Sequence, residues 1–221
     1  MRPFISPLPG FEQHPVRAFT ANAGAVQGLA SRSWTCGVNV MGRQGLLLYL
    51  MGPSGSGKDS LLQYLRYWAD PRVAVAHRYI TRTPEAGGEN HIFLYEWEYE
   101  ARRAAGLFAL DWSVHGYGYG IGREIDLWME RGFNVVLNGS RQAYAQAKKR
   151  YPRMRGIRVW APEPVLRERL RERQREEQTQ ISYRLERIAA IGPGEALPVV
   201  DNSGSLREAG EQLRALVEVF P

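Results

Sequence analysis

The 221-residue sequence contains a single cysteine, Cys36, and no long apolar run. One cysteine excludes a disulfide framework and a zinc site built from cysteines, and it favours a reducing, cytoplasmic location. The longest apolar run, residues 46–51, is far shorter than the roughly 18 residues that a membrane-spanning helix needs. The first ten residues also lack the basic-then-apolar order of a secretory signal. We therefore expect neither secretion nor membrane insertion.

Negative charge is scarce: 23 Asp and Glu face 29 Lys and Arg, which gives a net charge of +6. The excess is concentrated in residues 141–175, which hold twelve Lys or Arg and only three Glu. A basic surface can bind nucleic acid or phosphorylated small molecules. No nucleic-acid motif is present, and the densest part, residues 167–177, holds no aromatic side chain. We interpret most of this run as a solvated helix surface and expect no nucleic-acid partner.

Length and composition favour one α/β domain, because 44% hydrophobic residues suffice to build a core. We predict an irregular extension over residues 1–44 and a folded domain over residues 45–221. The first 40 residues hold four Pro, four Gly and only four charged residues, without apolar periodicity. Met41 offers an alternative start just before the first expected strand, in which case the extension is not part of the native chain.

Strands and helices alternate along the expected domain. Apolar runs of strand length occupy residues 46–51, 133–137, 156–160 and 197–200. Apolar residues at helical spacing predict helices over residues 59–69, 123–131, 164–175 and 206–217. This alternation predicts a parallel sheet that is covered by helices on both faces.

The most specific motif follows the first expected strand. Residues 52–58, Gly-Pro-Ser-Gly-Ser-Gly-Lys, match G-x-x-x-x-G-K between a buried strand and an amphipathic helix. The glycines let backbone N–H groups converge on phosphate oxygens, and the helix N-terminus adds partial positive charge. We therefore expect Lys58 to face solvent in the empty loop and to bind the β- and γ-phosphates of ATP. The predicted nucleotide-binding loop consists of Gly52, Pro53, Ser54, Gly55, Ser56, Gly57 and Lys58.

The residue after this lysine departs from the motif, which has Ser or Thr there to hold Mg²⁺. Asp59 occupies that position, and Ser60 follows it. Ser60 can supply the hydroxyl one residue late, and Asp59 can bind Mg²⁺ through water. Asp59 can equally be a first-turn acid that suits the helix dipole. The sequence leaves these alternatives open.

The segments after the loop resemble the guanylate kinase family. The family has Thr-Arg and Gly-Glu pairs, Gly-x-Phe and aromatic-glycine stretches, an arginine-rich lid and a late Asn-Asp pair. This sequence contains a counterpart of each. The counterparts are Thr81-Arg82, Gly88-Glu89, residues 106–108, residues 115–120, Arg169 with Arg173 and Arg184, and Asp201-Asn202. The resemblance covers residues 45–206. It implies a P-loop NTPase fold, a parallel sheet flanked by helices, with an acceptor-binding insertion and a lid.

The resemblance also implies roles for individual residues. Lys58, Arg173 and Arg184 would neutralise charge on the transferring phosphoryl group, and Asn202 would lie beside the adenine. Arg82 would bind a phosphate of the acceptor. The full set of acceptor-binding candidates is Arg78, Arg82, His91, Tyr117, Tyr119, Asn138, Ser140 and Arg141.

The acceptor pocket departs from guanylate kinases at several positions. Glu85 replaces a phosphate-binding arginine, and His91 replaces a tyrosine. Leu110 replaces the glutamate that reads guanine, while Asn138 and Ser140 replace aspartates. The N1–H and amino groups of guanine are donors that need a carboxylate acceptor. We therefore predict a pocket that still binds a phosphorylated acceptor but no longer recognises a guanine base.

Four strings resemble one branch of that family, the ribose 1,5-bisphosphate phosphokinases of phosphonate metabolism. They are GPSGSGKDS at residues 52–60, HRYITR with ENHI in residues 77–92, EIDLW at 124–128 and NGSR at 138–141. The resemblance implies ATP- and Mg²⁺-dependent phosphorylation of ribose 1,5-bisphosphate to 5-phospho-α-D-ribosyl 1-diphosphate, with ATP and a sugar phosphate as the partners of a monomer or homodimer.

Two alternatives to this function stay open. One is a guanylate kinase with a divergent base pocket, which the missing carboxylates disfavour. The other is a non-catalytic interaction module of the same fold. Such modules lose the loop lysine and the lid arginines, whereas Lys58, Arg173 and Arg184 are present here.

Overall fold

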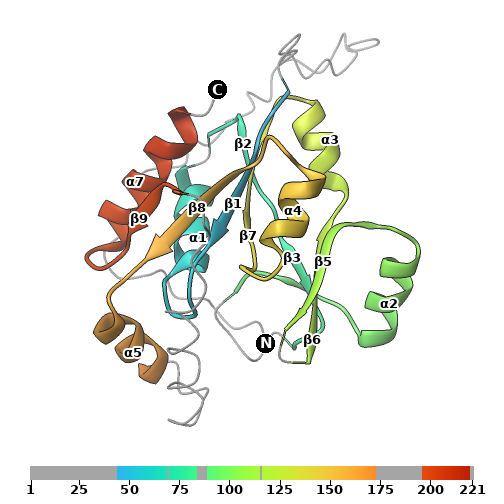
Figure 1. The fold of residues 1–221 in the computed structure, drawn as a ribbon, viewed down its shortest axis with the longest axis horizontal. Coiled ribbons are helices and arrows are strands. Elements are labelled where there is room, and N and C mark those ends of the chain that lie inside the picture. Colours follow the sequence, from blue (N-terminus) through green and yellow to red (C-terminus); the bar gives the residue numbers. More distant parts are fainter. Residues whose placement is uncertain (1–43, 69, 84–88, 115, 173–195, 220–221) are drawn as a thin grey trace, which may run out of the picture. The chain divides into compact units, whose positions relative to one another are not determined.

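The computed structural model describes residues 44–68, 70–83, 89–114, 116–172 and 196–219, and Figure 1 shows its helices and strands. The expected extension lies outside these residues except for Gln44, and so do Arg173 and Arg184 of the expected lid. None of the described helices is long and apolar enough to cross a membrane.

A five-stranded sheet forms the centre of the fold. Its order is β2 (Val73–Val75), β7 (Asn134–Asn138), β1 (Leu47–Met51), β8 (Arg155–Trp160) and β9 (Val199–Asp201). Every neighbouring pair is parallel, which confirms the predicted parallel sheet. The four predicted strands are present with boundaries shifted by at most two residues at either end. The short edge strand β2 was not predicted, because its three residues carry no distinctive pattern.

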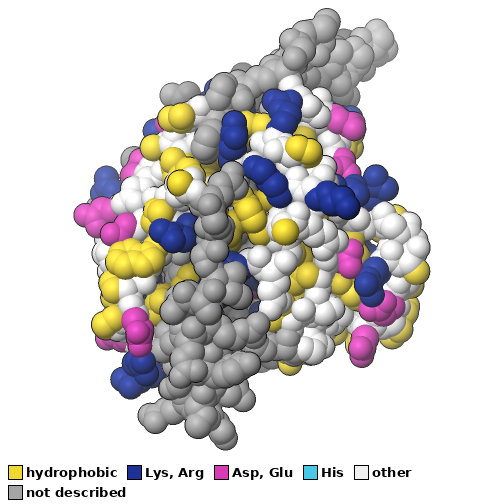
Figure 2. Space-filling model, in the orientation of Figure 1, with side chains coloured by type: hydrophobic (Ala, Val, Ile, Leu, Met, Phe, Trp, Pro, Cys, Tyr) yellow, Lys and Arg dark blue, Asp and Glu magenta, His cyan; other side chains and the backbone are white. Residues whose placement is uncertain are grey.

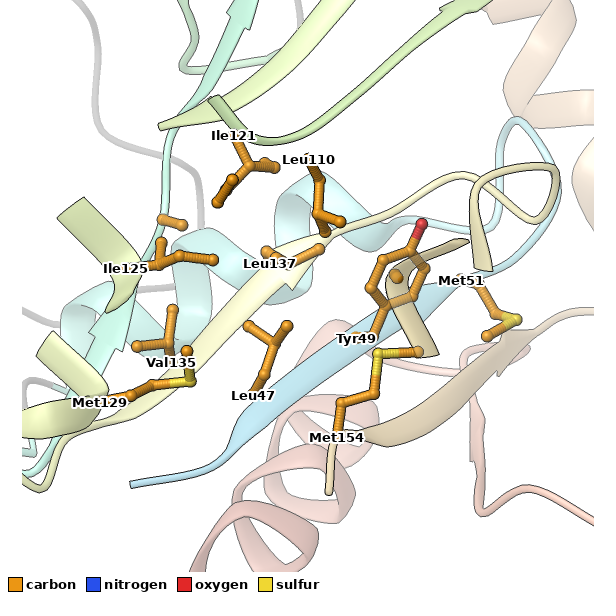
Figure 3. Packing of buried hydrophobic residues seen from close by; sticks show 13 residues of the cluster. Leu47, Tyr49, Met51, Leu110, Ile121, Ile125, Met129, Val135, Leu137 and Met154 are labelled. Carbon is orange, nitrogen blue, oxygen red and sulfur yellow. The ribbon is translucent and has the colours of Figure 1, made fainter. Parts of the chain in front are cut away.

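The central strand β1 divides the core into two parts, since successive side chains of a strand point to opposite faces. Leu48 and Leu50 pack with α1 (Lys58–Trp68) and α7 (Leu206–Val219). Leu47, Tyr49 and Met51 pack on the other face, with α3 (Glu124–Glu130) and α4 (Tyr144–Arg150) (Figure 3). The two helix layers are those that the alternation of strands and helices predicts.

A second sheet lies in the chain between β2 and α3, where the resemblance implies the acceptor-binding insertion. Its four strands are β4 (Ile92–Phe93), β3 (Arg78–Ile80), β6 (Tyr117–Gly122) and β5 (Phe108–Val114), in that order, and α2 (Glu96–Ala104) precedes β5. The sheet is mixed: β3 is parallel to β4 but antiparallel to β6.

The second sheet joins the core through apolar side chains. Leu110 of β5 and Ile121 of β6 are buried in one cluster with Leu137 of β7 (Figure 3). The acceptor region therefore rests on the strand that ends in Asn138. This apolar anchor holds the two sheets next to each other.

The described part of the basic stretch, residues 141–172, carries its Lys and Arg mostly on the surface. The last turn of α4 carries Lys148, Lys149 and Arg150. Arg150 pairs with Asp126 at 3.3 Å. Figure 2 shows Lys and Arg side chains in small separate groups on the face that carries α3 and α4. This arrangement agrees with a solvated, partly paired surface. The remaining described helix, α5 (Glu163–Glu172), follows β8.

Candidate active site

The P-loop connects the buried β1 to the first residue of α1. Gly55 and Gly57 have φ angles of 82° and 86°, in the left-handed region that glycine adopts at little cost. A Cβ atom at Gly57 would also lie only 2.2 Å from Nδ2 of Asn202. Glycine is thus required at this position for two reasons. Since α1 begins at Lys58, its free N–H groups and partial positive charge lie at the loop.

The prediction that Lys58 faces solvent is wrong. Its Nζ donates hydrogen bonds to the carbonyl oxygens of Gly52 and Pro53, each at 2.9 Å, and lies 3.4 Å from Oγ of Ser56. An ammonium group has three donors, and two of its acceptors here are carbonyl oxygens of the loop. The lysine is therefore held by its own loop, and phosphate oxygens would have to compete with those carbonyls.

Asn202 ties the end of β9 to the P-loop. Its side chain is 3% exposed, and Nδ2 donates to the carbonyl oxygen of Ser56 at 2.7 Å. Arg169 of α5 approaches the same place, because its Nη1 lies 3.9 Å from the position of a Cβ at Gly57. That nitrogen is buried and has no hydrogen-bond partner in the described part of the chain. An unpaired guanidinium donor beside a phosphate-binding loop suits an anionic ligand.

Replacing Asn202 by alanine should lower the melting temperature by roughly 3–10 °C. The change leaves the buried Ser56 carbonyl without its donor, which costs about 1–3 kcal/mol. Differential scanning calorimetry measures the shift, and Ser203→Ala at the exposed neighbouring position is the control. Equal melting temperatures for the two variants would show that Asn202 does not support the loop.

The carboxyl end of β7 lies beside the start of α1. Nδ2 of Asn138 donates to Oδ1 of Asp59 at 2.6 Å. Asn138 is 3% exposed, and its Oδ1 is buried without a hydrogen-bond partner among the described residues. Ser60, one residue further along α1, is exposed. Asp59 and Asn138 thus place a carboxylate and an unused amide oxygen together, and Mg²⁺ prefers oxygen ligands.

These two residues fit a magnesium site that is completed by the substrate. Within the described ranges, no three His, Cys, Asp or Glu side chains come together as a metal site. Mg²⁺ commonly uses one or two protein carboxylates and takes its other ligands from phosphates and water. The donor set at the end of β7 therefore suits Mg²⁺ bound with a nucleotide.

Tyr49, which the sequence did not single out, positions the segment after β7. Its hydroxyl donates to the backbone oxygen of Ser140 at 2.7 Å. The ring lies directly against Gly139, where a Cβ would come within 2.0 Å of it. Burial raises the pKa of this tyrosine, so the hydroxyl remains a donor. Arg141 follows and is partly buried. Only the fold brings β1 to this segment, so no local pattern could have identified Tyr49.

Arg78 of β3, Arg82 and the carboxylate of Glu89 form a cluster, called here the acceptor cluster. Arg78 donates to both carboxylate oxygens of Glu89 through Nε and Nη2. Arg82 approaches the same carboxylate with Nη2 at 3.8 Å from Oε2. Nε of Arg82 is buried and lacks a hydrogen-bond partner among the described residues. The cluster therefore carries an excess positive charge and an unused donor.

Aromatic rings border this cluster. The guanidinium of Arg78 lies over the ring of Tyr119, with its Cζ atom 5.2 Å from the ring centroid. Tyr119 in turn stacks on Trp112, with their planes 2° apart. Tyr117 lies at the start of β6 and is 40% exposed. The structure thus brings Tyr119, but not Tyr117, into contact with a predicted acceptor arginine.

His91 contacts the backbone of the acceptor segment. Its Nε2 lies 3.0 Å from the carbonyl oxygen of Arg82, and its Nδ1 lies 3.1 Å from that of Glu89. Both ring nitrogens thus face backbone oxygens of residues that carry the acceptor cluster. In this arrangement His91 supports the residues around Arg82 and Glu89.

No family model matches the chain. A curated protein of Thiobacillus denitrificans, ribose 1,5-bisphosphate phosphokinase PhnN, is 52% identical over 177 residues, which cover 79% of this chain and 93% of that protein. The PhnN proteins of Desulfomicrobium baculatum and Pantoea vagans are 51% and 48% identical over 174 residues, covering 93% and 97% of their own lengths. The chain belongs to the PhnN family.

The PhnN family membership confirms the branch that the four sequence strings indicated. Among solved structures, the guanylate kinase of Anaplasma phagocytophilum is similar to this PhnN-family chain. The TM-score is 0.59 at 17% identity, and the match covers 80% of this chain and 86% of that one. This likeness shows the fold alone and confirms the predicted guanylate kinase-like α/β architecture.

Proposed function

We propose that this chain transfers the γ-phosphoryl group of ATP to the 1-phosphate of ribose 1,5-bisphosphate. The products are ADP and 5-phospho-α-D-ribosyl 1-diphosphate. The names of relatives that are about half identical over most of the chain support this reaction. The single cysteine favours a reducing cytoplasm as the place where it occurs.

The observation that carries the proposal is the charge of the acceptor cluster. Arg78 and Arg82 share the single carboxylate of Glu89, which leaves net positive charge for an acceptor with two phosphates. Leu110, at the position where guanylate kinases have the guanine-reading glutamate, is buried among apolar side chains. The described residues of the acceptor region therefore favour phosphate groups over the guanine base.

The reaction needs no general base, because the attacking group is a phosphate oxygen that is already ionised at neutral pH. This oxygen forms a bond to the γ-phosphorus of ATP, while the bond from that phosphorus to the β–γ bridging oxygen breaks. ADP leaves with the electron pair, and the total charge stays the same on both sides. The protein therefore has to align the two phosphates and neutralise the charge on the transferring group.

Residues of the P-loop and α5 are placed for the donor. Lys58 would exchange its bonds to the Gly52 and Pro53 carbonyls for bonds to phosphate oxygens. Arg169 offers an unused buried donor at the loop. For Arg173 and Arg184 we propose the lid role that the family resemblance implies, which is to neutralise charge on the transferring phosphoryl group. Asp59 and Asn138 would hold Mg²⁺, which when bound adds positive charge at the β- and γ-phosphates.

A comparison of acceptors tests the proposal. With ATP as donor, ribose 1,5-bisphosphate should be preferred over GMP in kcat/KM by roughly tenfold to several-thousandfold. Each buried guanine donor that lacks a partner costs about 1–3 kcal/mol. Measuring ADP release with a coupled assay gives both values, and ribose 5-phosphate serves as the matched control because it lacks the attacking 1-phosphate.

Two results of this comparison would count against the proposal. If GMP were phosphorylated as efficiently as ribose 1,5-bisphosphate, the interpretation of the acceptor pocket would be wrong. If the enzyme released ADP as fast with ribose 5-phosphate as with the bisphosphate, the 1-phosphate would not be the group that accepts the phosphoryl group.

A further inference from the structure

One face of the second sheet carries Arg78 of the acceptor cluster. Paired residues on neighbouring strands place their side chains on the same face of a sheet, and so do residues two apart along one strand. The register sets Ile80 of β3 opposite Tyr119 of β6, and Tyr119 opposite Trp112 of β5. The next row on the same face consists of Arg78, Ile121 and Leu110. Arg78 therefore shares its face of the second sheet with Tyr119 and Trp112.

This face packs against the core. Leu110 and Ile121 are buried in the cluster that Figure 3 shows, and Trp112 packs against that cluster. Asp111, the acidic residue of β5, lies on the other face, since it alternates with Leu110 and Trp112. Its carboxylate pairs with Arg103 at 3.0 Å. Asp111 is therefore not placed to accept hydrogen bonds from an acceptor on the core-facing side.

The ring of Tyr119 is contacted from the strands on both sides of it, because β6 lies between β3 and β5. From β3, the guanidinium of Arg78 lies over the ring, with its Cζ atom 5.2 Å from the centroid. From β5, the indole of Trp112 stacks on the ring at a centroid distance of 5.7 Å, with nearly parallel planes. Tyr119 is left only 9% exposed. A nucleobase stacks on an aromatic side chain through an accessible ring face, and Trp112 takes up that place on Tyr119.

The covered ring adjoins the acceptor cluster, since Arg78 contacts both Glu89 and Tyr119. We propose that Trp112 is a specificity-determining residue, which excludes acceptors with an aromatic base by occupying the stacking place on Tyr119. A phosphorylated sugar has no such base and needs no stacking surface. The inference rests on the proposed function. It goes beyond the missing carboxylate at Leu110, which disfavours guanine alone, because Trp112 acts against any planar base.

A pair of inhibitors tests the assignment of Trp112. GMP and ribose 5-phosphate share a ribose and a 5-phosphate, but only GMP carries a base. Their inhibition constants against ribose 1,5-bisphosphate are measured at saturating ATP, which keeps the nucleotide site occupied. Trp112→Ala should lower the inhibition constant of GMP by about 5- to 150-fold, the range for stacking one base on an aromatic ring. The inhibition constant of ribose 5-phosphate should change less than about twofold, because this inhibitor has no base to stack.

Trp97→Ala is the matched control, because Trp97 on α2 is 71% exposed and stacks on Tyr95. Neither inhibition constant should change in this variant. Trp112→Phe keeps a flat ring and should retain most of the exclusion of GMP. If Trp112→Ala left the ratio of the two constants as in the wild type, even with both inhibitors bound more weakly, Trp112 would have a structural role only.

The outcomes separate this inference from the proposed function. If the wild type does not convert ribose 1,5-bisphosphate, the proposed function is wrong and the role of Trp112 falls with it. If the wild type converts it and the ratio of the constants is unchanged in Trp112→Ala, only the assignment of Trp112 is wrong. Circular dichroism melting checks that each variant is folded. Trp112→Leu, which keeps an apolar side chain against the core but has no flat ring, decides the question by the same ratio if Trp112→Ala does not fold.

Discussion

Lys58→Ala should reduce turnover by a factor on the order of 10³ or more, because it removes a positive charge from the transferring phosphoryl group. The variant also loses the hydrogen bonds to the Gly52 and Pro53 carbonyls. The loop is partly solvent-accessible, so we expect a loss of stability below about 3 kcal/mol, small beside the loss of rate. Steady-state turnover with ATP and ribose 1,5-bisphosphate, together with thermal melting, measures both effects.

Lys149→Ala is the matched control for this variant. Lys149 is an exposed lysine in the last turn of α4. Its replacement removes the same charge as Lys58→Ala, but at a position outside the P-loop. The control should keep nearly the wild-type rate. A Lys58→Ala protein that also kept it would remove the basis for a P-loop kinase mechanism.

Asp59→Asn should raise the Mg²⁺ concentration needed for half-maximal activity by about 10- to 100-fold. The asparagine removes the negative charge, yet its own side-chain oxygen can still accept the hydrogen bond from Asn138, so the fold should be retained. Activity measured over a range of Mg²⁺ concentrations at saturating substrates shows the shift.

Ser60→Ala distinguishes between Asp59 and Ser60 as the ligand of Mg²⁺. Because Ser60 is exposed, this change should leave the Mg²⁺ dependence nearly as in the wild type. The reverse pattern, with a large shift for Ser60→Ala and none for Asp59→Asn, would show that the hydroxyl one residue later holds the metal.

The central sheet and the P-loop could be predicted from the sequence because their signals are local. An apolar run, glycines at fixed spacing and a lysine before an amphipathic helix lie within about twenty residues. The placement of Lys58 could not be predicted in this way. Whether its ammonium extends into water or turns back depends on where the carbonyls of Gly52 and Pro53 point.

The second sheet was harder to predict from the sequence. Strands β3 and β4 have three and two residues, and β6 alternates glycine with Tyr117, Tyr119 and Ile121 instead of showing an apolar run. The resemblance supplied Arg82 and the Gly88-Glu89 pair, but not the sharing of the Glu89 carboxylate by two arginines. Such a contact depends on how the chain folds back on itself.

Contacts between distant elements were missed for the same reason. Tyr49 and Ser140 are 91 residues apart, and Asn138 and Asp59 are 79 apart. Each pair joins the carboxyl end of β7 to β1 or α1, where parallel sheets of this class place their ligands. The sequence identified Asn138 and Ser140 as candidates, because they stand where guanylate kinases have aspartates, but it did not identify the residues that hold them.

A phosphorus NMR spectrum of the wild-type protein incubated with ATP, Mg²⁺ and ribose 1,5-bisphosphate tests the proposed reaction directly. We expect the resonance of the 1-phosphate monoester to be replaced by the coupled pair of resonances of a diphosphate ester. The 5-phosphate monoester should remain, and one ADP should form for each diphosphate. An unchanged 1-phosphate resonance, while the same protein converts GMP to GDP, would contradict the proposed reaction.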